Sequence, residues 1–233
     1  MRLRSTRHVG DRGGVGGQKN MAIETEARWV PIAVSCDILD GTVIPARLPT
    51  GPIAVWRSAS GSLYANGDRC PHRGMRLSQG FVRGETLSCI YHGWRFGADG
   101  ACQKIPAHPK VSPPKTINCG PLPVTEANGV VWGAATSPVD APDQFVGHDA
   151  LRSLVVAAST DAIASACEGE WVGEAIAVTL GGQNTILLLN PYGPAEVLVI
   201  ALVPRGLTAP DLVRVSTALE ALRRSAEAVG EAA

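Results

Sequence analysis

The stretch "CPHRGMRLSQGFVRGETLSCIYHGW", residues 70–94, places two short Cys/His pairs close together in the chain. One residue separates Cys70 from His72, two separate Cys89 from His92, and sixteen lie between His72 and Cys89. Cysteine thiolates and histidine imidazoles are side chains that bind zinc and iron. The spacing therefore predicts a metal site built from two loops.

Two kinds of site fit this ligand set, and the ligand count alone does not decide between them. Two thiolates and two imidazoles can hold one tetrahedral zinc ion. They can also hold a [2Fe–2S] cluster, with both thiolates on one iron and both imidazoles on the other. Zinc fingers usually pair their ligands as Cys-x₂₋₄-Cys and His-x₃₋₅-His. Here each loop offers one sulfur and one nitrogen, and Gly74 and Gly93 suit tight loops, so the spacing favours the two-iron cluster.

The longer stretch "CPHRGMRLSQGFVRGETLSCIYHGWRFGADGACQKIP" closely resembles the Rieske domain of Rieske non-haem iron oxygenases, the ring-hydroxylating and O- or N-demethylating enzymes. The resemblance extends from about Trp29 through "LPVTEANGVVWG" at residues 122–133, roughly half of the chain. It implies a Rieske-type [2Fe–2S] cofactor. Carried over by position, the resemblance implies the following iron ligands: Cys70 and Cys89 on the inner iron, and His72 and His92 on the outer iron. Trp94 directly follows the second loop and is expected to shield the cluster from water.

The sequence departs from the respiratory-chain class of Rieske proteins, which resembles Cys-x-His-x-Gly-Cys and Cys-x-Cys-His with a disulfide between the loops. Met75 and Tyr91 occupy those cysteine positions here, so that disulfide cannot form. The respiratory class also places hydroxyl groups after the second histidine, where this chain has Trp94 and Phe96. With fewer donors to sulfur, we expect a reduction potential near the low end of the Rieske range, about −150 mV.

Composition limits the binding partners and the cellular compartment that we expect for this protein. The 233 residues carry 21 Lys or Arg and 21 Asp or Glu, so net charge predicts no nucleic-acid partner and no membrane partner. No apolar run approaches the length of a membrane span. Residues 1–20 are basic, lack the apolar segment of a secretory signal and are expected to be disordered, with Met21 as an alternative start. A reducing cytoplasm follows as an expectation, with free thiols rather than disulfides at the cysteines outside the metal motifs.

The hydrophobic pattern predicts two domains. Residues 21–137 are expected to form the Rieske domain, a mostly β unit resembling an antiparallel sandwich, with hairpins at 52–66, 95–105 and 122–134. A linker is expected at 138–154. Residues 155–233 are expected to form a small α+β domain of three antiparallel strands and one long helix capped by Thr208. The apolar stripe of that helix is Leu212, Val215, Leu219, Leu222, Ala226 and Val229.

Several other residues are better explained without a role at the metal. His108 lies in a Pro-rich turn and His148 in the linker, so both are expected at the surface. Cys102 and Cys119 are expected to be small buried thiols. Trp56, Trp132 and Trp171 alternate with apolar residues on strands, so core packing is expected for each.

The resembled oxygenases need a mononuclear iron held by two histidines and one carboxylate. The sequence lacks the histidine pattern for this second iron site. The five histidines are His8, His72, His92, His108 and His148, and no His-x₃₋₄-His pair occurs. We therefore expect no catalytic residue in this chain and a C-terminal domain truncated relative to the family. The sequence predicts an electron-transfer subunit that takes electrons from a reductase or ferredoxin and passes them to a partner oxygenase in a hetero-oligomer. A structural or regulatory subunit and a stand-alone carrier remain as alternatives.

Overall fold

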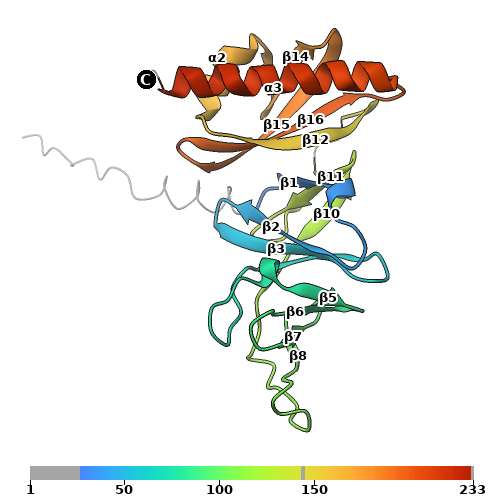
Figure 1. Ribbon diagram of the computed structural model, residues 1–233, viewed down its shortest axis with the longest axis vertical. Coiled ribbons are helices and arrows are strands. Elements are labelled where there is room, and N and C mark those ends of the chain that lie inside the picture. Colours follow the sequence, from blue (N-terminus) through green and yellow to red (C-terminus); the bar gives the residue numbers. More distant parts are fainter. Residues whose placement is uncertain (1–26, 143–144, 232–233) are drawn as a thin grey trace, which may run out of the picture.

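The computed structural model describes residues 27–142 and 145–231. The chain forms two stacked units, with β5–β8 at one end of the long axis and the helix α3 (Ala209–Glu231) at the other (Figure 1). Every strand pairing among these residues is antiparallel. The predicted fold class, a mostly β unit followed by a smaller unit with a long C-terminal helix, is confirmed. The basic segment 1–20 lies outside the described residues.

The first unit consists of three sheets, ordered β1-β11-β10, β2-β3-β4-β9 and β5-β6-β7-β8. Their strands are β1 (Val30–Val34), β2 (Val43–Leu48), β3 (Gly51–Arg57), β4 (Leu63–Gly67), β5 (Phe81–Arg83), β6 (Thr86–Ser88), β7 (Arg95–Phe96), β8 (Cys102–Lys104), β9 (Pro121–Leu122), β10 (Val124–Ala127) and β11 (Val130–Gly133). Two 3-10 turns, η1 (Ser35–Asp37) and η2 (Leu77–Gln79), connect strands of this unit.

The three predicted hairpins of this unit are confirmed. β3 pairs with β4, β7 with β8, and β10 with β11. The last hairpin turns at Asn128 and Gly129, whose φ angles are 54° and 72°. Two consecutive positive φ angles match the twist of the flanking strands, and Asn-Gly is the residue pair that tolerates them best.

The second unit is one five-stranded sheet, ordered β12-β16-β15-β14-β13, with two helices on one face. Its elements are β12 (His148–Val156), α2 (Thr160–Cys167), β13 (Glu170–Val172), β14 (Ala175–Leu180), β15 (Gln183–Gly193), β16 (Glu196–Pro204) and α3. The expectation of three strands was wrong, because β12 begins within the expected linker and a turn at 173–174 separates β13 from β14. The helix α2 was not predicted, although Ser159 caps it by accepting a hydrogen bond from the Ala162 N–H.

The long helix begins where the sequence predicts. The Thr208 hydroxyl accepts a hydrogen bond from the Asp211 N–H at 3.4 Å, and the Asp211 carboxylate accepts one from the Thr208 N–H at 3.1 Å. Val215, Leu219 and Ala226 are buried against the sheet, as expected. Val229 is 46% exposed, so the expected apolar stripe ends one turn early. The core assignment of Trp171 was also wrong, because it lies on a three-residue edge strand and is 51% exposed.

The opposite face of the second sheet packs on the first unit. One hydrophobic cluster joins Val34, Val130 and Trp132 of the first unit to the strands β14, β15 and β16. The buried Asn190 amide donates hydrogen bonds to the backbone carbonyls of Pro31 and Arg47, each at 3.0 Å. Because buried carbonyls need partners, this amide links the sheet to two strands of the first unit. No helix among the described residues is long and apolar enough to cross a membrane.

Candidate metal centre

Two loops with the same backbone hydrogen bonds bring the predicted ligands together. In the first, the Cys70 N–H donates to the Met75 carbonyl at 2.8 Å and the Gly74 N–H to the Cys70 carbonyl at 2.8 Å. In the second, the Cys89 N–H donates to the Trp94 carbonyl at 2.9 Å and the Gly93 N–H to the Cys89 carbonyl at 3.0 Å. Each loop thus starts at its cysteine and closes four and five residues later.

Glycine is required at the closing position of both loops. Gly74 has a φ of 72° and Gly93 a φ of 68°, in the left-handed region that other residues rarely adopt. A Cβ at Gly93 would also lie 3.2 Å from Cγ of Pro106, in the loop that follows β8. Two equivalent turns therefore present one cysteine and one histidine each, as the spacing predicts.

Thiols and imidazoles occupy different depths at this site. Cys70 and Cys89 are 3% and 2% exposed and belong to a hydrophobic cluster with Trp56, Leu77 and Phe96. His72 is half-buried, and His92 is exposed. The two cysteine sulfur atoms are thus buried, whereas the two histidine rings lie closer to the protein surface.

Aromatic rings surround the imidazoles. The His72 and His92 rings lie 4.7 Å apart between centroids, edge to face. The Trp94 indole stacks on His72 at 4.4 Å with an interplanar angle of 5°, and Tyr91 contacts His92 at 3.9 Å. Trp94 is half-buried in this position, and its role as a shield stays a prediction.

Burial perturbs the protonation of two of the four side chains. Burial raises the pKa of the Cys70 thiol to about 11, and the neighbouring Cys89 adds to the rise. Burial and the nearby His92 and Arg73 lower the pKa of His72. A metal ion reverses the preference of a buried thiol, because a coordinated thiolate is the stable form.

A contact between Asp68 and Ser78, which the sequence analysis did not predict, stabilises the first loop. Asp68, 1% exposed, accepts hydrogen bonds from the N–H of Ser78 at 2.7 Å and from its hydroxyl at 2.9 Å. The two residues flank the loop, so their contact closes its base. An acidic residue two positions before the cysteine and a serine eight positions after it were the available signals.

The four side chains fit a two-iron cluster by donor chemistry. Among the described residues, no three His, Cys, Asp or Glu side chains converge as one metal ion would require. A Rieske cluster does not require such convergence, because each of its irons takes only two protein ligands. Two neighbouring thiols and two neighbouring imidazoles would provide those two pairs.

The remaining predicted residues lie away from these loops or within the core. His108 is exposed, as expected. His148 is half-buried and begins β12, so its placement on an exposed linker was wrong. Cys102 and Cys119 are buried, as expected, and burial raises the pKa of Cys119 to about 12. Trp56 and Trp132 are buried, which confirms their assignment to the core.

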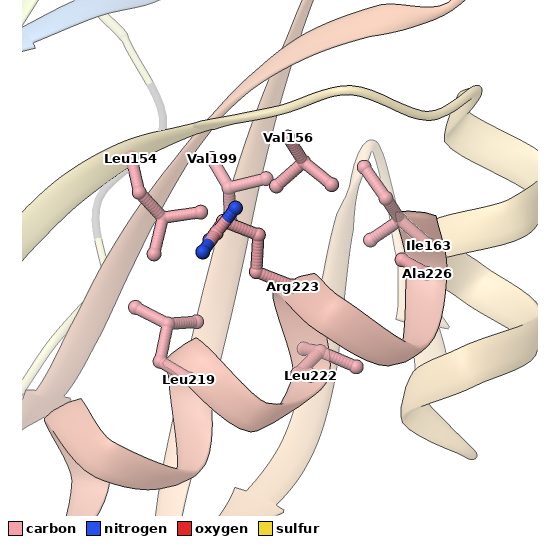
Figure 2. A pocket seen from close by; sticks show the side chains of 8 residues that line it. All are labelled: Leu154, Val156, Ile163, Val199, Leu219, Leu222, Arg223 and Ala226. Atoms are coloured by element: carbon pink, nitrogen blue, oxygen red, sulfur yellow. The ribbon is translucent and has the colours of Figure 1, made fainter. Parts of the chain in front are cut away.

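The space between α3 and the second sheet is filled by side chains. The cavity found there has a volume of about 10 Å³ (Figure 2). A single water needs about that much room. Apolar side chains line it together with the stem of Arg223, whose guanidinium pairs with Glu220 and Glu227. This cavity cannot admit an organic substrate.

Comparison with known proteins matches a segment that contains both loops. Residues 28–119 match the Rieske [2Fe-2S] domain family. The chain is 36% identical over 148 residues to the oxidoreductase NdmD of Pseudomonas putida, covering 59% of this chain and 25% of that protein. It is 44% identical over 108 residues to the 4beta-methylsterol monooxygenase of Methylococcus capsulatus, covering 45% of this chain and 29% of the relative.

The fold similarity reaches further than the sequence similarity. The crystal structure of apo dicamba monooxygenase matches with a TM-score of 0.70 at 20% identity, covering 89% of this chain and 86% of that one. The match therefore includes the second unit as well as the cluster loops. Residues 28–119 therefore form a Rieske [2Fe–2S] domain, and the two sequence relatives are an oxidoreductase and a monooxygenase, of which this chain spans about a quarter of the length.

Proposed function

We propose that this chain is the iron–sulfur subunit of an oxygenase complex, with Cys70, Cys89, His72 and His92 as the cluster ligands. It accepts one electron at a time from a reductase or ferredoxin. It passes each electron to a mononuclear iron held by a partner oxygenase chain. The observation that carries the proposal is the pair of matched loops, with buried thiols beneath two touching imidazoles.

The accessible imidazole is the natural exit for the electron. His92 is exposed and its ring contacts both His72 and Tyr91, whereas the two cysteines are enclosed by apolar side chains. A ring N–H at the surface can donate a hydrogen bond to a partner carboxylate, which would orient the ring and tune the cluster.

The proposal assigns the mononuclear iron to a partner because this chain has few ligands left for it. Beyond the proposed cluster ligands the sequence has only His8, His108 and His148. A facial triad needs two histidines and a carboxylate together. A relative 27% identical over 191 residues is named the oxygenase subunit of 5,5'-dehydrodivanillate O-demethylase, from Sphingobium. Its name indicates an enzyme of several chains, as proposed here.

Metal analysis tests the cluster directly. Anaerobically purified protein should contain two irons and two sulfides per chain and, once reduced, give the low-average-g EPR signal of a Rieske centre. His72→Cys should transform this signal and Cys89→Ser should abolish it, while Cys36→Ser, an exposed thiol outside the site, should leave it unchanged. Stoichiometric zinc with no iron would refute the assignment.

Co-purification separates the proposal from its alternatives. The second unit, with its filled interior, would serve as a scaffold in a mixed oligomer of the cytoplasm. A tagged chain should then retain an oxygenase-like protein that contains iron, and that protein should reoxidise the reduced cluster. A stand-alone carrier would purify alone. A structural subunit would retain the partner but leave its turnover unchanged when Cys89→Ser removes the cluster.

A further inference from the structure

The charges of this neutral chain are unevenly distributed. Residues 69–115 contain eight Lys or Arg and two Asp or Glu, a net charge of +6, so the rest of the chain has a net charge of −6. Residues 145–231 contain five Lys or Arg and ten Asp or Glu, a net charge of −5. The neutrality of the whole chain hides this separation.

The two charged regions lie at opposite ends of the molecule. The segment 69–115 includes both metal loops and the strands β5–β8, at one end of the long axis (Figure 1). The second unit, capped by α3, forms the other end. The molecule therefore has a dipole along its long axis, with the positive end at the metal centre.

The cations at the positive end are not neutralised. Among the described residues, none of the eight cations forms a salt bridge, whereas six arginines elsewhere do. The two acidic residues of the segment bind neutral groups, since Glu85 accepts hydrogen bonds from Ser60 and Asp99 from the Ala101 N–H. The cations are Arg69, Arg73, Arg76, Arg83, Arg95, Lys104, Lys110 and Lys115, of which all but the half-buried Arg95 are exposed.

One pair of these cations is locally unfavourable. Arg95 on β7 lies directly opposite Lys104 on β8. Like charges at opposed positions of an antiparallel pair destabilise the sheet. A partner that supplies negative charge would relieve this repulsion.

Apolar and aromatic side chains lie exposed at the same end. Ile90 and Tyr91, in the second metal loop, are 55% and 62% exposed, and His92 lies next to them. Protein interfaces typically combine an apolar, aromatic centre with a charged rim that steers the encounter. Ile90, Tyr91 and His92 provide such a centre, and the cations of the segment provide the rim.

We propose that the metal-bearing end of this chain is a docking surface for an acidic electron-donor protein. This inference rests on the proposed function and adds the chemistry of the donor. The dipole would turn the positive end toward an acidic partner before contact, and Ile90 and Tyr91 would pack against it afterwards. In each encounter one electron leaves the reduced donor and enters the cluster, so the donor is oxidised by one electron and the cluster reduced by one.

Stopped-flow reduction by a plant-type ferredoxin, an acidic one-electron donor, tests the docking surface on the cluster-loaded protein. Steering predicts a second-order rate that falls at least tenfold between about 20 mM and about 300 mM salt. Lys110→Glu/Lys115→Glu should lower the low-salt rate about tenfold and flatten its salt dependence. Both lysines are exposed and neither belongs to a metal loop.

Two controls keep this test separate from the proposed function. Arg224→Glu makes the same kind of charge reversal on an exposed position of α3, and its low-salt rate should stay within about twofold of the wild type. Reduction by photogenerated deazaflavin radical reports the cluster without docking, and all variants should be reduced equally.

The possible outcomes distinguish a failure of the docking surface from a failure of the cluster assignment. Normal reduction by deazaflavin with no reduction by ferredoxin, or with a salt-independent rate, would overturn the docking surface and leave the cluster assignment intact. An equal loss in the Arg224→Glu variant would also overturn it. Tight, salt-dependent binding to duplex DNA that the two lysine substitutions abolish would assign the surface to nucleic acid instead. Failure of deazaflavin reduction would refute the proposed function itself.

Discussion

At the residue scale, the metal centre depends on side chains that bind no metal. The two cysteines and two histidines are fixed by closed turns, and the turns are fixed by glycine and by neighbouring groups. Asp68 is the clearest case, because it is a buried carboxylate one residue away from Arg69 and two from Cys70. Its carboxylate accepts both hydrogen bonds from Ser78, on the other side of the loop.

Replacing Asp68 by Asn should loosen the first metal loop. The amide keeps the shape but loses the charge that strengthens both hydrogen bonds from Ser78, at a cost of about 2 kcal/mol in the free energy of unfolding. Urea unfolding of the cluster-loaded protein would measure this cost, and iron content would report the loop. Ser78→Ala removes only the hydroxyl and should cost about 1 kcal/mol. If neither substitution changed the free energy of unfolding or the iron content, the contact between Asp68 and Ser78 would not stabilise the first metal loop.

A second residue-scale prediction concerns acid stability. Glu126 accepts hydrogen bonds from the Arg57 guanidinium at 2.7 and 3.2 Å, and this contact lowers the pKa of Glu126 below its usual value. A carboxylate with a lowered folded-state pKa stabilises the fold above its unfolded pKa. The stabilisation is lost as pH falls through the folded pKa. Glu126→Gln should therefore be less stable than wild type at pH 7, and the difference should shrink on acidification.

Urea midpoints for both proteins between about pH 7 and about pH 3 would measure the predicted convergence. Arg57→Gln serves as a companion, since it removes the same ion pair from the other side. It also removes hydrogen bonds to the carbonyls of Ile38 and Gly61, so it should cost more at every pH. A stability gap for Glu126→Gln that widens as pH falls would rule the assignment out.

At the element scale, the sequence correctly predicted the elements that are specified by a strong local sequence motif. The metal loops, the Asn128-Gly129 hairpin and the capped start of α3 each carry such a signal, and each forms as predicted. Signals failed where tertiary context decides. β12 follows a Pro- and Asp-rich stretch that hides its strand pattern. Trp171 alternates like a core residue but lies on the edge strand β13, where its side chain is exposed.

The turn between β14 and β15 offers an element-scale test with a built-in control. Gly181 and Gly182 both have positive φ angles, 56° and 80°. A Cβ at Gly181 would lie 2.7 Å from backbone atoms of Arg214 and Val215 on α3, whereas a Cβ at Gly182 meets nothing within 4 Å. Substitution by Ala therefore adds backbone strain at both positions but a clash with the helix only at the first.

Gly182→Ala should cost about 1 kcal/mol for the left-handed backbone. Gly181→Ala should cost about 1–3 kcal/mol more, because the helix must move or the turn must distort. Thermal or urea unfolding of the two variants side by side measures the difference. Equal losses would mean that α3 does not pack against this turn as closely as the structure has it.

At the scale of the whole molecule, two features were invisible in the sequence pattern. The charge separation becomes meaningful only once β5–β8 and α3 are seen at opposite ends (Figure 1). The filled space beneath α3 likewise depends on how Leu154, Val199 and Leu219 meet (Figure 2). Both are features that the proposed function uses, with electron exchange at the metal-bearing end and a scaffold at the other.

The final prediction concerns catalysis by this chain alone. Oxygen activation by a non-haem iron enzyme needs an iron with open positions, held by two histidines and a carboxylate. His108 and His148 are the only described histidines outside the metal loops, and they lie forty residues apart on a turn and at the start of β12. Given a reductase, NAD(P)H and aromatic or methylated substrates, the isolated chain should be reduced but should consume no oxygen in proportion to substrate. With an iron-containing partner, substrate-coupled uptake should appear, and Cys89→Ser should silence it without changing the partner's iron content. An oxygen electrode and product analysis measure both steps, and coupled turnover by the isolated chain would show that it carries an oxygenase site of its own.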